Sequence, residues 1–101
     1  MKVYSGSRTI DGLVVLVDGD PLERRYDLKR FTRTGFEWTY EGPGPSQLSL
    51  ALLADHLDDD AKALALCDGF MRSVVANLEN DWELTGEDMD RAIEALGNPR
   101  Q

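Results

Sequence analysis

The segment from Phe36 to Leu57, FEWTYEGPGPSQLSLALLADHL, constrains the fold of this chain more than any other segment. Its first five residues alternate, with Phe36, Trp38 and Tyr40 on one side, and this period of two predicts a half-buried strand. Its second half is apolar around nearly the whole circumference, which predicts a buried helix over residues 45–57. The Gly-Pro-Gly-Pro sequence between the two predicts the corner at which the strand gives way to the helix.

Three further strands are expected before the strand at Phe36. The pattern predicts a short strand at Val3 and Tyr4, a second from Leu13 to Val17, and a return strand from Leu22 to Leu28, so that the strands occupy about residues 3–41. Trp82 to Leu84 could add one more short strand.

Two amphipathic helices follow the buried one, over about residues 61–78 and 86–96. Helix 61–78 carries an apolar stripe of Leu64, Cys67, Met71, Val74, Val75 and Leu78. Thr85 and Asp88 have the spacing of a capping box at the start of helix 86–96, whose apolar face is Met89, Ile93 and Leu96. The order of elements predicts one α+β domain over residues 1–101, with a small antiparallel sheet of three to four strands packed on one face by three helices.

Length and composition narrow the class of protein. The chain has 101 residues, enough for one hydrophobic core, and 42% hydrophobic with 30% charged residues is ordinary for a globular domain. The longest apolar run is far shorter than a membrane span, and the first residues lack the apolar core of a signal peptide. A single cysteine, Cys67, cannot form an internal disulfide, so a cytoplasmic protein is expected.

The net charge of −8 is unevenly distributed. Residues 1–35 hold seven Lys/Arg and five Asp/Glu, whereas residues 36–101 hold four and fourteen, giving balances of +2 and −10. Acidic helices can serve solubility alone, but they also repel nucleic acid and attract basic partners. The candidate partner-binding residues are the exposed acids of the helical half: Asp55, Asp58, Asp59, Asp60, Glu83, Glu87, Asp90 and Glu94.

Other kinds of site find weaker support in the sequence. The corner at Gly42 to Ser46 resembles a phosphate-binding helix start, but two of its five residues are prolines without an N–H, and no P-loop lysine follows. The acids around His56 lack the glycine and closing glutamate of an EF-hand, which favours a solvated helix junction over a metal site. Cys67 lies on an apolar stripe, and no base is evident beside Ser46 or Ser49, so we expect no catalytic residue, metal or cofactor.

A basic segment lies between the predicted strands. It holds five cations, Arg24, Arg25, Lys29, Arg30 and Arg33, with aromatic residues between them. The pattern resembles a small nucleic-acid patch. Because acids lie within the segment and the rest of the chain is strongly negative, a charge-guarded sheet edge or a protein contact is favoured over nucleic acid.

The chain resembles an uncharacterised bacterial and phage family, domain of unknown function 6166. The resemblance rests on the F-x-W-x-Y-x-G pattern from Phe36 to Gly42 and the G-P-S-Q-L sequence that follows, and it covers about residues 3–95. The chain has Thr39 and Glu41 where the family pattern would place glycine. The resemblance implies a fold and a microbial or mobile-element origin, and no activity.

These observations favour a non-catalytic, acidic protein-interaction domain, a monomer or weak dimer that binds a partner protein with a basic surface, and neither nucleic acid nor membrane. Size, acidity and the phage-like family are similar to those of anti-CRISPR inhibitors of nucleic-acid-binding defence complexes, which is an analogy. The alternative is a small ligand-binding domain or enzyme that uses the corner formed by Trp38, Tyr40 and Gln47.

Overall fold

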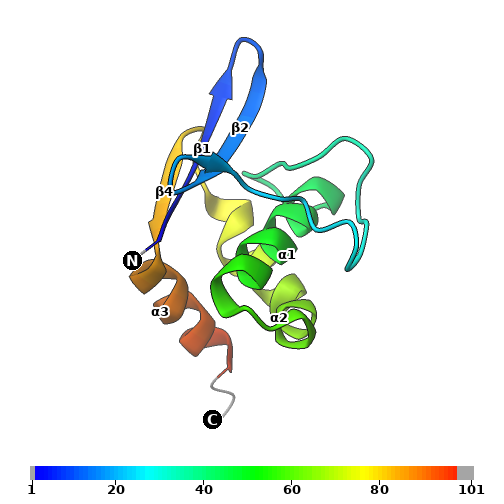
Figure 1. Ribbon diagram of the computed structural model, residues 1–101, viewed down its shortest axis with the longest axis vertical. Coiled ribbons are helices and arrows are strands. Elements are labelled where there is room, and N and C mark those ends of the chain that lie inside the picture. Colours follow the sequence, from blue (N-terminus) through cyan, green and yellow to red (C-terminus); the bar gives the residue numbers. More distant parts are fainter. Residues whose placement is uncertain (1, 98–101) are drawn as a thin grey trace.

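One antiparallel sheet has the strand order β3-β2-β1-β4 in the computed structural model, which describes residues 2–97 (Figure 1). The strands are β1 (Val3–Thr9), β2 (Gly12–Val17), β3 (Asp20–Pro21) and β4 (Trp82–Thr85). Tyr4 of β1 is paired with Val17 of β2 on one side and with Leu84 of β4 on the other. Strand β1 therefore pairs with β2, which follows it directly, and with β4, which comes after α2 in the sequence.

The β1–β2 hairpin is longer than the sequence pattern predicts and extends beyond its neighbours. β4 pairs only with residues Val3 to Gly6 of β1, and β3 only with Leu16 and Val17 of β2. The remaining part of the hairpin projects from the body of the molecule (Figure 1), and Ile10 at its tip is fully exposed.

The helices are α1 (Pro43–Leu57), α2 (Asp60–Ser73) and α3 (Gly86–Gly97), with a 3₁₀ turn η1 (Val75–Asn77) after α2. The predicted fold class, α+β with a small antiparallel sheet and three helices, is confirmed. Among the helices of residues 2–97, none combines the length and the apolarity required to cross a membrane.

Helix α1 is the centre of the core, as its apolar sequence predicts. Every residue from Gln47 to Ala54 is buried. The helix stops at Asp58, which adopts a left-handed conformation (φ 54°), and Asp59 then caps α2 by accepting a hydrogen bond from the backbone N–H of Lys62 at 3.0 Å. The inward face of the sheet covers the same core with Tyr4, Val15 and Trp82.

The capping box predicted for α3 is present. The backbone N–H of Asp88 donates to Oγ1 of Thr85 at 3.1 Å, and the backbone N–H of Thr85 donates to Oδ2 of Asp88 at 2.9 Å. The hydrogen bond from the Thr85 N–H to the carboxylate, followed by the nearby Thr85 hydroxyl, lowers the pKa of Asp88.

The predicted strand from Phe36 to Tyr40 is wrong. This segment is irregular, and its alternation does not set burial: Trp38 is fully buried, Phe36 is half-buried and Tyr40 is half-exposed. Thr39 has φ 81°, which breaks an extended chain, and its N–H donates to the carbonyl of Val75 rather than to a strand. Both edges of β1 are already occupied by β2 and β4, so the sheet has no place for this segment beside its central strand.

The predicted return strand from Leu22 to Leu28 is also wrong. Only Asp20 and Pro21 form strand β3, and the chain leaves the sheet after the Leu22 N–H has donated to the carbonyl of Val15 at 3.1 Å. Arg25 has φ 57°, and its carbonyl accepts from the N–H groups of Leu28 and Lys29, which makes a turn. Residues 22–42 thus form one long loop between the sheet and α1, here called the 22–42 loop.

The second helix is shorter than predicted, and its buried stripe is rotated by one position. Ala63, Cys67, Phe70 and Met71 are buried in α2, whereas Leu64 is 40% exposed. The side-chain amide of Asn77 donates to the carbonyls of Arg72 and Ser73, and these bonds satisfy the end of the helix.

Candidate functional site

Three of the four candidate acids near the α1–α2 junction also support the fold. Asp55 accepts hydrogen bonds from the hydroxyl of Tyr4 at 2.7 Å and from Nζ of Lys2 at 3.0 Å. Asp59 caps α2, and Asp60 is 3.3 Å from the guanidinium of Arg25. Asp58 is exposed, and its carboxylate has no hydrogen-bond or ion-pair partner among residues 2–97. Asp58 is therefore the carboxylate of this group that is most readily available to a partner.

Helix α3 and strand β4 carry the other four candidates, all of them exposed. Glu87, Asp90 and Glu94 are exposed on α3, outside the stripe of its buried residues Met89 and Ile93. Glu87 is 3.1 Å from Arg91 one turn further along, an exposed pair that contributes little to stability. Glu83 is exposed on β4.

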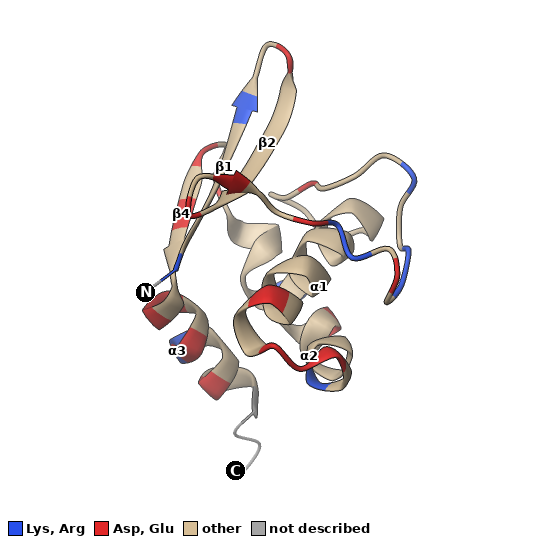
Figure 2. Ribbon diagram, viewed as in Figure 1, with Lys and Arg blue, Asp and Glu red and all other residues tan. Residues whose placement is uncertain are grey.

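A contact between His56 and Asp90 joins the two groups of acids. Nε2 of His56, near the end of α1, is 2.6 Å from Oδ1 of Asp90 on α3. Figure 2 shows the acidic segments of α3 and of the α1–α2 junction in the lower part of the view. The junction also meets the basic 22–42 loop, because Arg25 of that loop is 3.3 Å from Asp60. The contact places Asp90 of α3 beside the end of α1, whereas Glu83 lies on the sheet, where it is paired with Ser5 of β1. We call this set, the eight candidate acids, the acidic surface.

A cavity of about 420 Å³ lies at the junction of α1 and α3. It is lined by Lys2, His56, Gly86, Glu87 and Asp90. Lys2 faces it together with the acids Glu87 and Asp90, so this hollow is of mixed charge rather than uniformly negative.

The hydroxyl of Tyr4 lies beneath this region and is fully buried. Burial, together with its hydrogen bond to the Asp55 carboxylate, raises the pKa of Tyr4 well above its ordinary value of 10.0. Tyr4 therefore stays protonated as a donor to Asp55 and is a structural group rather than a base.

The corner of Trp38, Tyr40 and Gln47 is mostly interior. Trp38 and Gln47 are fully buried, and only Tyr40 is open to solvent. The Gln47 amide donates to the carbonyls of Arg24 and Lys29 and accepts from the N–H of Phe31. Its polar groups are thus occupied in holding the 22–42 loop to α1.

The Gly42 to Ser46 corner is a close packing point. Gly44 lies against Glu37, and a Cβ added at Gly44 would come within 2.6 Å of the Glu37 Cβ. No side chain caps the start of α1 at Gly42. At this corner Glu37 of the 22–42 loop packs so closely on the start of α1 that only glycine fits at position 44.

The remaining chemical candidates are dispersed. Within residues 2–97, no three His, Cys, Asp or Glu side chains are placed to hold a metal ion. Cys67 is 3% exposed, its thiol donates to the carbonyl of Ser46 at 3.3 Å, and burial raises its pKa. A thiol in this state is a packing residue.

Sequence reasoning missed Arg8, whose contacts organise one side of the core. Its guanidinium bonds to Asn80, to Glu37 and to the carbonyl of Trp38, and it stacks over the Trp38 ring at 4.9 Å. A signal was present: Arg8 shares with Tyr4 and Gly6 the side of β1 that faces inward, where a charged residue needs partners.

A four-stranded antiparallel sheet with three helices defines a small α+β domain. The model of the Family of unknown function (DUF6166) matches residues 4–95, nearly the whole chain. The protein therefore belongs to this family. Searches of the curated proteins and of the solved structures found no match.

Proposed function

We propose that the protein is a non-catalytic interaction domain that binds a basic surface of another protein through its acidic surface. The observation that carries the proposal is the 2.6 Å contact between His56 and Asp90, which places the end of α1 beside α3. This contact brings the acidic end of α1 and the acidic side of α3 together in a molecule whose net charge is −8.

The availability of the carboxylates supports the proposal. Asp58, Glu83 and Glu94 are exposed, and their side chains have no hydrogen-bond or ion-pair partner within residues 2–97. Exposed charges of this kind act chiefly by raising the rate of association with an oppositely charged surface, and the effect weakens with salt.

The alternative, a ligand-binding domain or enzyme at the Trp38, Tyr40 and Gln47 corner, has less support. Two of its three side chains are fully buried, and the amide of Gln47 already makes three hydrogen bonds within the chain.

We further propose that the partner is a nucleic-acid-binding protein of a defence complex, as for anti-CRISPR inhibitors. Such proteins present the basic surfaces that a cluster of carboxylates would occupy in place of phosphates. The reduced state expected of the buried Cys67 suits a cytoplasmic setting.

The test compares two charge-reversal pairs as baits in affinity capture from the native host. Asp58→Lys with Glu94→Lys alters the acidic surface at two unpartnered carboxylates. Asp11→Lys with Glu41→Lys makes the same change in net charge at exposed positions of the hairpin tip and the 22–42 loop. Pairs that include Asp59 or Asp60 are unsuitable because these residues cap α2 and hold Arg25.

The expected result is a captured protein with a basic surface whose association rate falls about ten-fold or more with the first pair and changes little with the second. Added nucleic acid should compete for that partner. Equal loss with both pairs would show non-specific charge attraction, and indifference to both would remove the acidic surface from recognition. Either result overturns the proposal.

A further inference from the structure

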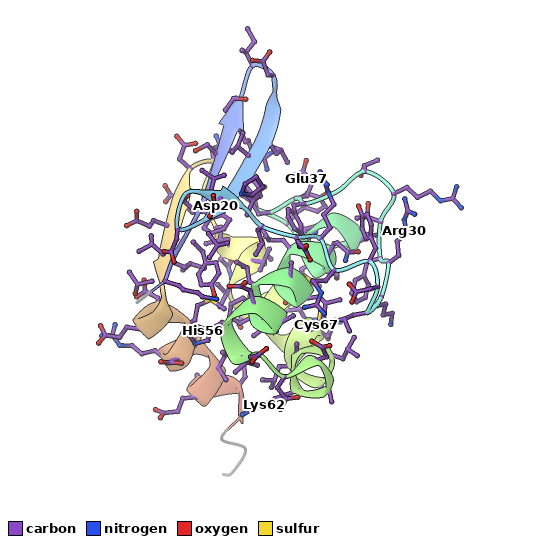
Figure 3. The ribbon with its side chains drawn as sticks, in the orientation of Figure 1. Asp20, Arg30, Glu37, His56, Lys62 and Cys67 are labelled. Carbon is purple, nitrogen blue, oxygen red and sulfur yellow. The ribbon has the colours of Figure 1, made fainter. Side chains whose placement is uncertain are left out.

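The 22–42 loop carries the main positive feature of an otherwise acidic protein. Three of its arginines, Arg24, Arg30 and Arg33, line one cavity of about 260 Å³ together with Tyr26, Thr34 and Gly35. Figure 2 shows the basic segments of this loop on the side opposite α3, and Figure 3 labels Arg30 there, far from His56.

The charges of these three arginines are not neutralised by the part of the chain that the structure describes. None of the three forms an ion pair with a carboxylate among residues 2–97. Arg25, next to Arg24, takes the nearby acids instead: its guanidinium binds Asp27 at 3.1 Å and Asp60 at 3.3 Å.

Two of the guanidiniums are positioned by aromatic rings. Arg30 lies 4.7 Å from the centre of the Tyr26 ring, and Arg24 lies 5.9 Å from the centre of the Phe36 ring. Nε of Arg30 also donates to the carbonyl of Thr32 at 3.2 Å, which leaves its two terminal nitrogens for a ligand. Side chains held in this way lose less conformational entropy when they bind.

The backbone under the arginines is fixed by Gln47 of α1. The side chain of Gln47 forms hydrogen bonds with the backbone of Arg24, Lys29 and Phe31. Arg24 is one of the cavity arginines, and the other two residues flank Arg30. Because Gln47 is fully buried, the loop is tied to the core beneath the cavity. The cavity is therefore a preorganised feature of the fold.

A second cavity of about 260 Å³ adjoins the first. Arg24 and Thr34 line both cavities, and the second is otherwise lined by Leu13, Val15, Phe36 and Glu37. One compartment is thus rich in guanidinium groups, and its neighbour presents three apolar side chains.

We propose that these two compartments bind a small phosphorylated organic molecule, with its phosphate at Arg24, Arg30 and Arg33 and its apolar or aromatic part against Leu13, Val15 and Phe36. Planar guanidiniums match phosphate oxygens with paired, charge-assisted hydrogen bonds. Three unneutralised cations suit a doubly charged phosphate better than a single carboxylate. A long nucleic acid is disfavoured because it would have to cross Glu23 and Asp27 on the same loop and an acidic protein beyond it.

The test measures binding of three probes by calorimetry at fixed ionic strength: inorganic phosphate, naphthyl phosphate and a short single-stranded DNA oligonucleotide. Naphthyl phosphate should bind with one-to-one stoichiometry and more tightly than inorganic phosphate, because its ring fills the apolar compartment. The matched variants are Arg24→Gln with Arg33→Gln, and Lys62→Gln with Arg72→Gln on the exposed face of α2. Both pairs lower the net charge equally.

The cavity pair should weaken naphthyl phosphate binding about a hundred-fold, roughly ten-fold for each arginine, while the α2 pair changes it less than about two-fold. Leu13→Asn should weaken naphthyl phosphate binding and leave inorganic phosphate unchanged. Circular dichroism confirms folding, and because the arginines are exposed, the variants should melt like the wild type.

Equal weakening by the two pairs, or no saturable binding of naphthyl phosphate, would overturn the proposal. An oligonucleotide that binds more tightly than naphthyl phosphate would overturn it in favour of a nucleic-acid surface. Because the acidic surface is unaltered in the cavity pair, failure here is distinguishable from failure of the proposed protein interaction.

Discussion

The indole rings of Trp38 and Trp82 meet edge to face, with their centres 5.7 Å apart and an angle of 85° between the ring planes. Trp38 comes from the 22–42 loop and Trp82 from strand β4, so this pair locks an irregular segment to the sheet. Trp82 in turn lies directly against Gly6, where a Cβ would come within 2.4 Å of the indole ring. This side-chain packing holds the loop together with the hydrogen bonds of Gln47, although residues 22–42 form no strand.

Replacement of Trp38 by alanine should lower the free energy of unfolding by about 3–5 kcal/mol. The side chain is fully buried, and its loss removes both the ring pair and the surface on which Arg8 stacks. Urea denaturation measures the change. Ile10→Ala, at a fully exposed position, is the control and should alter stability by less than about 0.5 kcal/mol. A Trp38→Ala protein with the wild-type midpoint would contradict this assignment of the core.

Thr39→Gly should stabilise the protein by about 0.5–1 kcal/mol. Thr39 has φ 81°, which costs a residue with a Cβ about 1–2 kcal/mol, and the greater freedom of glycine in the unfolded chain offsets part of the gain. Glycine is also what the family resemblance leads one to expect at this position.

The matched control is Thr39→Ala, which removes the same hydroxyl but keeps the Cβ. It should give no gain in thermal midpoint. A gain with alanine as large as with glycine would show that the hydroxyl, and not the backbone conformation, is unfavourable.

Cys67 should react slowly with thiol reagents in the native protein and rapidly after unfolding. The side chain is 3% exposed, and burial raises its pKa, so both access and the thiolate fraction are low. Labelling followed by mass spectrometry, with and without denaturant, measures the ratio of rates. Fast native labelling would mean that α2 separates from α1 frequently in the folded protein.

Stability should fall at alkaline pH, and Tyr4 should be a main cause. The pKa of Tyr4 is raised in the folded protein, so above its ordinary value of 10.0 the unfolded chain loses a proton that the folded chain retains. Its contribution is therefore complete below that value and decreases as the pH rises further. Urea denaturation of the wild type and Tyr4→Phe between about pH 8 and about pH 11 should show a shallower decline for the variant. Equal slopes would exclude Tyr4 as the cause.

Local sequence patterns correctly predicted the elements that are determined by neighbouring residues of the same segment. The apolar run around Leu50 becomes the buried helix α1, and the spacing of Thr85 and Asp88 becomes the cap of α3. The strand predicted at Phe36 to Tyr40 failed because Thr39 has φ 81°, which breaks an extended chain, and because Arg8, far away in sequence, holds Trp38 instead.

The candidate sites show the same difference between what the local sequence predicts and what depends on tertiary packing. The sequence identified the acids of the acidic surface by composition, but the contact of His56 with Asp90 depends on how α1 and α3 pack. It also identified the cations of the 22–42 loop, but not which of them are neutralised. Asp60, which pairs with Arg25, is 35 residues distant, and no local pattern reports that pairing.

The position of strand β1 between β2 and β4 has consequences for folding during synthesis on the ribosome. The neighbour β2 follows β1 directly in the sequence and can pair with it at once, but the other neighbour, β4, is synthesised only after α1 and α2. Until then one edge of β1 offers its backbone groups to any extended chain nearby, including a second nascent copy. The order of synthesis therefore gives this domain an interval of vulnerability to aggregation that ends only when Trp82 to Thr85 have emerged.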